Sequence, residues 1–478
     1  MRRFVCCLFA LTSLVGVANA QQYSTYKQAT LDAVAALEAD IYTMSMALWS
    51  YAETALLETE SAALLANILE KEGFAVQRGV SGMPTAFVAR FGSGSPRIGI
   101  LAEYDALPGV GNAPAPHRQG RDDGVTSGHG CGHNLFGAAS VAAAIALKRT
   151  IETNNMPGTI HLYGTPAEET VVGKVYMAKD GLFDGADAVL EWHPGLDTAV
   201  RNQTGRALNN FEVEFFGQAA HASADPWNGR SALDAVEMMN FGVNLMREHV
   251  RPTTRIHYVV PRAGDAPNVV PEYAKVWYFV RDTDRQSVEE WYAWILKIAE
   301  GAALATRTDH KVFLTTGVHE YNLNRPLQEA LQANLEAIGS PVFSEEEQAF
   351  ARSLQEFLGL DQKGFNTEVE PLADEPEPVS GGSTDVAEVS YITPTAGFSV
   401  VTAAADVPWH SWATTACHGT AASVKGAVVA AKVLALTGAD LLTDTALLEE
   451  SRAYFEEKTG GKGYKSPIPQ DQTVPLPG

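Results

Sequence analysis

The chain has 478 residues, of which 46% are hydrophobic and 19% are charged. This composition excludes an intrinsically disordered chain, and the length favours two domains that each bury their own core. A formal net charge of −22 disfavours nucleic acid and anionic membranes as partners, so an anionic substrate would need local cations or a metal ion to hold it.

The first twenty residues have the pattern of a secretory signal peptide. Arg2 and Arg3 precede an apolar stretch, and Ala18-Asn19-Ala20 matches a small-residue cleavage site. The stretch is short for a membrane-spanning helix, which needs about 20 residues, so an uncleaved anchor is the weaker alternative. We expect an exported protein, periplasmic or secreted, from which residues 1–20 are removed. No later stretch is predicted to span a bilayer, so the mature form should have no membrane contact.

Export would leave only two cysteines, Cys131 and Cys417, because Cys6 and Cys7 lie in the signal peptide. Two cysteines exclude a framework of several disulfides. A single disulfide between Cys131 and Cys417 is one alternative in an oxidising compartment. A metal-bound Cys131 thiolate is the other.

After the signal peptide, apolar residues at helical spacing from Tyr26 to about Leu69 predict two helices. Four short apolar segments then predict buried strands: Arg97–Ala102, Thr159–Tyr163, Asp187–Trp192 and Gly397–Thr402. An alanine-rich stretch, about Leu135 to Arg149, predicts a helix that packs closely on a sheet. A last helix is predicted over Ala422–Leu436. The alternation of strands and helices is typical of an open α/β sheet.

The segment from Leu208 to about Glu320 follows a different order, βαββαβ, which is the ferredoxin-like arrangement. Its predicted strands are 210–216, 255–260, 273–280 and 310–316, and its predicted helices are 231–249 and 287–306. After this segment, strand and helix patterns typical of the open α/β sheet resume. We therefore predict an α/β fold, in which an open mixed sheet with helices on both faces forms the catalytic domain and an α+β domain is inserted. The expected boundaries are 21–207 and 321–445 for the catalytic domain, 208–320 for the insertion and 446–478 for a C-terminal extension.

Two segments near the C-terminus are predicted to lie outside regular structure. Glu368–Pro378 is rich in acidic residues and proline, which predicts an exposed loop. The tail from Gly460 is rich in glycine, lysine and proline, which predicts an extended arm or a disordered segment.

Metal-binding side chains gather after the predicted strands, where an open α/β sheet normally binds its ligand. Thiolate, imidazole and carboxylate groups, the usual zinc ligands, all occur there. Each is a weak signal alone, because an isolated Cys-x-His is more often structural and an adjacent glutamate pair is usually solvated. Their convergence predicts a metal site. The residues are Glu103, Asp105, Cys131, His133, Glu168, Glu169, His193 and His410.

Together these residues belong to an ordered set of motifs that resembles the M20 metallopeptidase family over nearly the whole mature chain. The resemblance is to its amidohydrolase branch, which includes p-aminobenzoyl-glutamate hydrolases and indole-acetyl-amino-acid hydrolases. The motifs GHGCGHN and GGSTD are most similar to those of the large-subunit type of p-aminobenzoyl-glutamate hydrolase. The motifs are AEYDALPG (102–109), GHGCGHN (128–134), PAEE (166–169), EWHPG (191–195), GQAAHAS (217–223), NVVPEYA (268–274), GGSTD (381–385) and PWHSW (408–412).

The resemblance implies two divalent metal ions per subunit, zinc or manganese, bridged by the Cys131 thiolate. Glu168 would be the general base, and Asp105 would orient a ligand. Other M20 branches have a metal-binding His-x-Asp where this chain has Glu103-Tyr104-Asp105, so ligation by Glu103 is left open. The remaining implied ligands are His133, Glu169, His193 and His410.

The resemblance also implies a homodimer formed through the inserted domain, whose His221 would reach an active site and stabilise the oxyanion. Asn268 and Arg281 would hold the substrate carboxylate. On the residues alone, Asn268 could equally be a turn residue and Arg281 a solvated strand charge. A second type of subunit is a further partner that the sequence leaves open.

The implied reaction is hydrolysis of the amide bond of a small N-acyl amino acid such as p-aminobenzoyl-glutamate. A broad dipeptidase or an N-acyl-amino-acid acylase is the alternative enzyme. A periplasmic binding protein without turnover is the alternative from another class, but such a protein has no use for a base such as Glu168 beside the metal.

Overall fold

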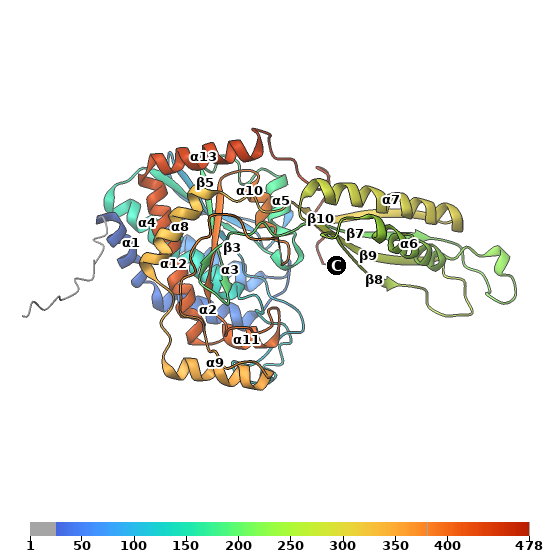
Figure 1. The fold of residues 1–478 in the computed structure, drawn as a ribbon, viewed down its shortest axis with the longest axis horizontal. Coiled ribbons are helices and arrows are strands. Elements are labelled where there is room, and N and C mark those ends of the chain that lie inside the picture. The colour runs from blue at the N-terminus through green and yellow to red at the C-terminus, as the bar shows by residue number, and fades with distance from the viewer. Residues whose placement is uncertain (1–24, 380, 478) are drawn as a thin grey trace, which may run out of the picture.

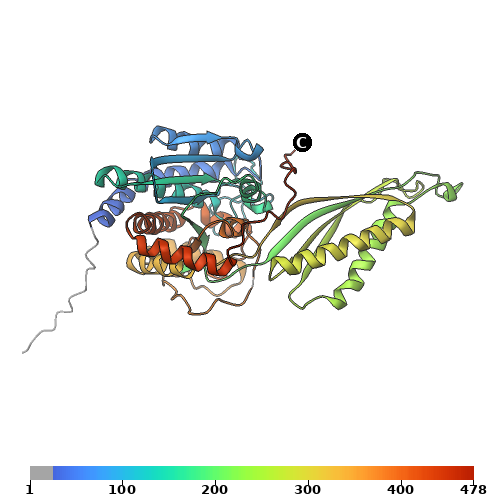
Figure 2. The same cartoon turned by 90° about the horizontal axis from the view of Figure 1, so that it is seen from above.

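The computed structural model describes residues 25–379 and 381–477, so the predicted signal peptide lies outside the described residues. The described chain forms a broad α/β domain and a narrow arm that projects from one side of it (Figure 1 and Figure 2). The largest cluster of buried apolar residues lies in the broad domain, and the arm has a cluster of its own.

The described part of the chain begins with three helices where two were predicted: α1 (Thr25–Ala35), α2 (Glu38–Tyr51) and α3 (Thr59–Lys71). The break between α1 and α2 is a short turn at which Leu37 remains 3% exposed. Because the apolar pattern continues through this turn, periodicity alone does not reveal it.

The broad domain contains a seven-stranded mixed sheet in the order β1-β2-β4-β3-β5-β11-β6. The four predicted strands are its parallel centre, and three antiparallel strands at its edges were missed. The bounds are β1 (Ala75–Arg78), β2 (Phe87–Ser93), β3 (Arg97–Ala102), β4 (Gly158–Gly164), β5 (Ala188–Gly195), β6 (Ala199–Val200) and β11 (Thr395–Val401). The predicted α/β class is confirmed.

Two long helices, α4 (His133–Asn154) and α12 (Ala421–Thr443), pack against each other and against the sheet. Glycine allows α4 to approach closely, because a Cβ on Gly137 would lie 2.8 Å from the carbonyl oxygen of Glu103. The other helices of this domain are α5 (Gly173–Lys179), α8 (Arg325–Ile338), α9 (Glu345–Leu358), α10 (Val386–Ser390), α11 (Trp412–His418) and α13 (Thr445–Thr459).

By length and composition, helix α12 is long and apolar enough to cross a membrane. No membrane-spanning stretch after the signal peptide was predicted from the sequence. However, 78% of its most apolar window is buried inside the protein, where it contacts α4, α1 and α8. Its composition is therefore that of a core helix that is surrounded by other elements.

The arm has the predicted βαββαβ order, with an antiparallel sheet ordered β10-β7-β9-β8 and two helices on one face. Along β9, alternate residues Ala274, Val276, Tyr278 and Val280 are buried in the core of the arm, so Trp277, Phe279 and Arg281 face the other side of the sheet. The elements are β7 (Ala207–Phe216), α6 (Ala232–Met246), β8 (Arg255–Arg262), β9 (Tyr273–Asp282), α7 (Arg285–Thr306) and β10 (Asp309–Val318).

The C-terminal tail is extended, as one of the two alternatives predicted, and it is docked where the two domains meet. Gln472 Nε2 donates to the carbonyl of Leu314 at 2.6 Å and to the hydroxyl of Tyr176 at 2.7 Å, which joins β10 to α5. Ile468 is buried, and the Tyr464 hydroxyl donates to Glu388. The acidic loop 368–378 is largely exposed, as predicted.

Candidate metal centre

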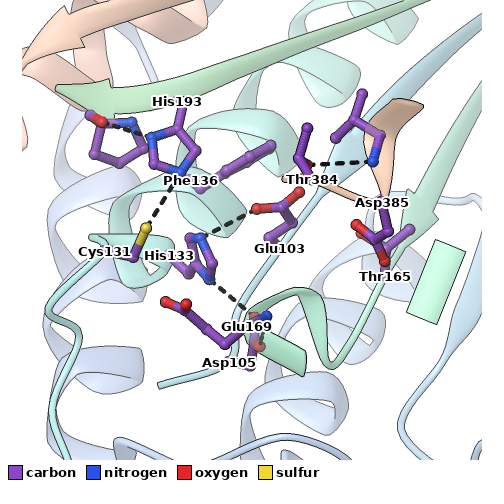
Figure 3. Close-up of polar contacts among 12 residues, drawn as sticks. Glu103, Asp105, Cys131, His133, Phe136, Thr165, Glu169, His193, Thr384 and Asp385 are labelled. Carbon is purple, nitrogen blue, oxygen red and sulfur yellow. Dashed lines mark hydrogen bonds and ion pairs between the residues drawn. The ribbon is translucent and has the colours of Figure 1, made fainter. Parts of the chain in front are cut away.

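The metal-binding candidates meet near the carboxyl ends of the parallel strands. Figure 3 shows six of them together: Glu103, Asp105, Cys131, His133, Glu169 and His193. Glu103 follows β3, Glu168 and Glu169 lie in a 3₁₀ turn after β4, and His193 lies inside β5 rather than after it. Cys131 precedes α4, His133 is its first residue, and His410 follows β11. This convergence is the expected property of an open α/β sheet.

Unusual backbone conformations position several of these side chains. Gly132 has φ 81°, and a Cβ there would lie 2.6 Å from the side chain of Pro194, so only glycine lets Cys131 and His133 approach His193. Ala167, which precedes Glu168, has φ 59°, and His410 has φ 56°. Such values are uncommon outside glycine and cluster at functional sites.

Two groups of candidate ligands share the thiol of Cys131. The donor atoms of Cys131, His133 and His193 lie within 4.8 Å of one another, and so do those of Cys131, Glu169 and His410. Cys131 Sγ is 3.3 Å from Nε2 of His193 and 3.3 Å from Nε2 of His410. A thiolate that belongs to two donor groups has the placement that a bridging ligand requires.

Hydrogen bonds orient the imidazoles toward the interior of this centre. Asp105 accepts from Nδ1 of His133 at 2.9 Å, and its second oxygen accepts from the backbone N–H of Glu169 at 2.9 Å (Figure 3). The carbonyl of Pro194 accepts from Nδ1 of His193 at 2.6 Å. Each bond occupies Nδ1 and leaves Nε2 facing the other donor atoms of the centre, which is how metal-bound histidines are usually oriented.

The donor set fits divalent metal ions. Glu169 Oε1 is buried and has no hydrogen-bond partner among the described residues, which leaves it available to a cation. Burial and nearby carboxylates raise the pKa of Glu168 well above its usual range, and burial raises the pKa of Glu169 to about 7. Burial also raises the pKa of the Cys131 thiol. Without a cation this cluster is destabilised by its own charge, and divalent ions reverse that effect.

The centre opens into a cavity of about 510 Å³ between the two domains. Arg281, which extends from β9 of the arm, lines this cavity together with Phe279, and its guanidinium lies 5.4 Å from the Phe279 ring centroid. Arg281 has no acidic side chain within ion-pair distance among the described residues, and its Nε is buried without a partner. Arg201 lines the same cavity but is paired with Glu191 at 3.0 Å. Arg281 is therefore the cation available to an anionic ligand.

His221 and Asn268 lie elsewhere on the arm and do not line the cavity of their own chain. The exposed His221 accepts backbone N–H bonds at Nδ1 from Ser223 and Ala224, and it forms a β-bridge with Val269. The backbone carbonyl of the exposed Asn268 accepts from Ala222. Within one chain, the structure does not bring either residue to the metal centre.

No role was assigned from the sequence to three residues at the centre, which are Trp409, Lys174 and Asp385. Trp409 Nε1 donates to Cys131 Sγ at 3.3 Å. Lys174 is fully buried and contacts both Glu103 and Asp385, the last residue of the GGSTD motif. A lysine inside the otherwise apolar stretch 171–178 was the signal that could have identified it.

The two described cysteines, Cys131 and Cys417, are both buried and unpaired. The structure therefore does not show the alternative in which a disulfide joins Cys131 and Cys417.

Comparison with known proteins places this chain among related enzymes. A sequence profile of the peptidase family M20/M25/M40 matches residues 99–360, which is more than half of the chain. The chain belongs to the M20 peptidase family. It is 37% identical to one of the p-aminobenzoyl-glutamate hydrolase subunits of Escherichia coli (strain K12), over 89% of this chain and 94% of that protein. It is 28% identical to the Xaa-Arg dipeptidase of Mus musculus, over 93% of this chain and 95% of that protein.

Solved structures of M20 proteins have the same fold. The aminobenzoyl-glutamate utilization protein from Klebsiella pneumoniae superposes with a TM-score of 0.59 at 17% identity, over 85% of this chain and 97% of that chain. A dinuclear metal-binding M20 peptidase from Bacillus subtilis superposes with a TM-score of 0.52 at 20% identity, over 84% of this chain and 99% of that chain. The predicted family and its class of activity, metal-dependent hydrolysis of amide bonds, are confirmed.

Proposed function

We propose that this M20 enzyme hydrolyses the amide bond of N-acyl amino acids whose amino-acid part carries an acidic side chain, with p-aminobenzoyl-glutamate as the representative substrate. One observation carries the proposal: Arg281, which has no acidic partner among the described residues, lines the same cavity as the two donor groups that share Cys131. A cation that lines the same cavity as a metal centre suits a substrate that has a carboxylate near the scissile amide. The relative that is 37% identical is named for such a substrate.

The chemical role proposed for each side chain follows from its position in the metal centre or in the cavity. Two divalent ions, zinc or manganese, held by Cys131, His133, Glu169, His193 and His410, would polarise the scissile carbonyl and make water more acidic. Glu168 takes the proton of the attacking water and transfers it to the leaving amine. Asp105 keeps His133 in the orientation needed for binding. Arg281 holds the substrate carboxylate, and Asn268, which does not line the cavity of its own chain, would be a second contact only from the arm of a partner subunit.

A substrate panel tests this function. Metal-loaded protein is assayed for amine release from p-aminobenzoyl-glutamate, indole-acetyl-aspartate, N-acetyl amino acids with neutral side chains, and dipeptides. We expect the highest kcat/KM on the two acidic amides, and we expect Arg281→Ala to raise KM for p-aminobenzoyl-glutamate about tenfold or more. Preference for neutral dipeptides or N-acetyl amino acids would favour the dipeptidase or acylase alternative. No turnover on any substrate, with or without a second type of subunit, would refute the proposal.

We also propose that the arm forms a homodimer and that His221 acts in the active site of the partner. Three features of the described residues support it. The edge of strand β8 is not paired. Met238, Phe241 and Leu245 are 47%, 65% and 56% exposed on one face of α6. His221 is exposed and lies outside its own cavity.

A second type of subunit is the alternative partner. The p-aminobenzoyl-glutamate hydrolase of Escherichia coli (strain K12) has two different subunits, and both are similar to this chain. The second of them is 29% identical over 40% of this chain and 46% of that protein. Activity that appears only when such a chain is added would favour this alternative over the homodimer.

Mixing two inactive variants should restore activity if the site is shared between two copies. In a dimer of His221→Ala with Glu168→Gln, one of the two sites has both an intact base and an intact partner histidine. Random exchange makes half of all dimers mixed, so we expect about one quarter of the wild-type activity. Each variant carried through the exchange protocol alone is the control. Mixed dimers without recovered activity, or a fully active monomer, would contradict the shared site.

The signal-peptide pattern supports export as a further part of this proposal. N-terminal sequencing of the native protein should find a chain that starts at Gln21.

A further inference from the structure

A buried series of charged side chains leads away from His133. Glu103 Oε2 lies 3.1 Å from His133 Nε2, and Glu103 Oε1 lies 2.7 Å from Lys174 Nζ. Lys174 Nζ in turn lies 2.6 Å from Asp385 Oδ1. The side chains of all four residues are at most 1% exposed. No step of the proposed reaction uses Glu103, Lys174 or Asp385.

Glu103 and His133 lie within ion-pair distance, which the dashed line between them in Figure 3 marks, but without hydrogen-bond geometry. Both Glu103 Oε2 and His133 Nε2 are buried and lack a partner with hydrogen-bond geometry, although only 3.1 Å separates them (Figure 3). Two unsatisfied polar atoms this close to each other suit a shared cation. Bond lengths of about 2.0 to 2.2 Å to zinc place neighbouring nitrogen and oxygen ligands roughly 3 to 3.5 Å apart.

Lys174 restrains the other oxygen of Glu103. Its backbone N–H donates to Asp385 Oδ2 at 2.8 Å, so Asp385 contacts both the backbone and the ammonium group of Lys174. Gly173 also lets α5 begin directly against the turn that carries Glu168, since a Cβ there would lie 1.9 Å from the carbonyl of Pro166. The ammonium group is therefore fixed at its backbone and at its tip.

The charges of Glu103, Lys174 and Asp385 do not cancel. Glu103 and Asp385 are two carboxylates, and Lys174 supplies one ammonium group between them. One negative charge is left over, on a carboxylate whose free oxygen faces His133. A buried excess charge is costly without a nearby cation, and a metal ion on His133 would supply that cation.

We propose that Glu103 is a further ligand of the metal ion that His133 binds, and that Lys174, anchored by Asp385, is a positioning residue that holds the Glu103 carboxylate in place. This inference rests on the proposed metal centre. It resolves the question that the sequence left open for Glu103, and it gives the aspartate of the GGSTD motif a part in building the centre.

The test measures metal binding directly, without substrate. Zinc affinity of the two sites is obtained by competition with a chelator, and the visible spectrum of the cobalt-substituted protein reports the ligands. We expect Glu103→Gln to weaken one ion about 10- to 100-fold and to change the cobalt spectrum, because an amide oxygen is a poorer ligand than a carboxylate. Lys174→Met should change the spectrum in the same direction, and Lys174→Arg should restore part of it.

Lys179→Met is the matched control. Lys179 lies on the same helix, and its Nζ donates to the backbone carbonyl of Gln472 at 2.6 Å and lies 3.6 Å from Asp180. It does not contact the centre, so its substitution should leave both affinities unchanged. Glu103→Asp is the second variant should Glu103→Gln not fold, since it keeps the charge but withdraws the carboxylate, and it should weaken the same ion. Unchanged zinc affinity and cobalt spectrum in a folded Glu103 variant would overturn the inference and leave the proposed function standing. Wild-type protein that binds neither zinc nor manganese would overturn both.

Discussion

Glu168→Gln should leave both metal ions bound and lower kcat by about a hundredfold or more. A glutamine amide can still form hydrogen bonds with water, but it cannot accept the proton of water. The Glu168 side chain lies with Glu103 and His133 at the centre and lines the cavity, so removing its charge changes the proton acceptor without removing a proposed ligand. The measurements are kcat on p-aminobenzoyl-glutamate and metal content by elemental analysis.

The adjacent residue is the matched control for this prediction. Glu169 belongs to the donor group of Cys131 and His410, and its Oε2 lies 3.4 Å from His410 Nε2. Glu169→Gln should therefore lower metal content as well as activity. If Glu168→Gln kept its activity, Glu168 would not be the base. If Glu169→Gln kept both ions, the roles within this pair would be reversed or wrong.

Cys131→Ser should lose metal and activity together. The Cys131 thiol belongs to both donor groups, so its loss weakens two ions at once, whereas substitution of a ligand in one group weakens mainly one. A serine hydroxyl is also a much weaker ligand, since it does not ionise near neutral pH. We expect activity to fall below about one thousandth of the wild type at micromolar metal.

Cys417→Ala is the control, because Cys417 is the other buried, unpaired cysteine of the described chain and does not line the cavity. It should keep both metal ions and its activity. In wild-type protein, a thiol reagent should modify Cys131 slowly, and a chelator should accelerate the reaction. A disulfide between Cys131 and Cys417, found by mass spectrometry in fully active protein, would contradict the metal-bridging role.

The sequence predicted the centre of the sheet but not its edges. Strands β3, β4, β5 and β11 are rich in apolar residues and almost entirely buried because neighbouring strands and helices cover them on all sides. Strand β1 is short and mostly exposed, and only the first half of β2 is buried, so neither has a distinctive pattern. The local pattern of a strand weakens where solvent replaces a neighbour.

The predicted ligands could be found from the sequence because most of them lie within or after the central parallel strands, and Cys131 and His133 lie at the start of α4, the helix that follows β3. The carboxyl ends of such strands meet at one edge, so residues that are far apart in the chain are brought together by the topology alone. The motif resemblance then distinguished these side chains from other histidines and acids of the same kind.

What the sequence by itself determined was therefore the fold class, the family and the set of candidate ligands, since these depend on local apolar patterns and on ordered motifs. Only the tertiary structure decided the contacts that link those motifs. Lys174 reaches Asp385 across 211 positions, Arg281 extends from the arm into the cavity, and the tail at Gln472 joins the two domains. These contacts depend on the distance between side chains after the chain has folded. No local pattern encodes that distance, because each residue alone is compatible with an exposed charge or a free tail.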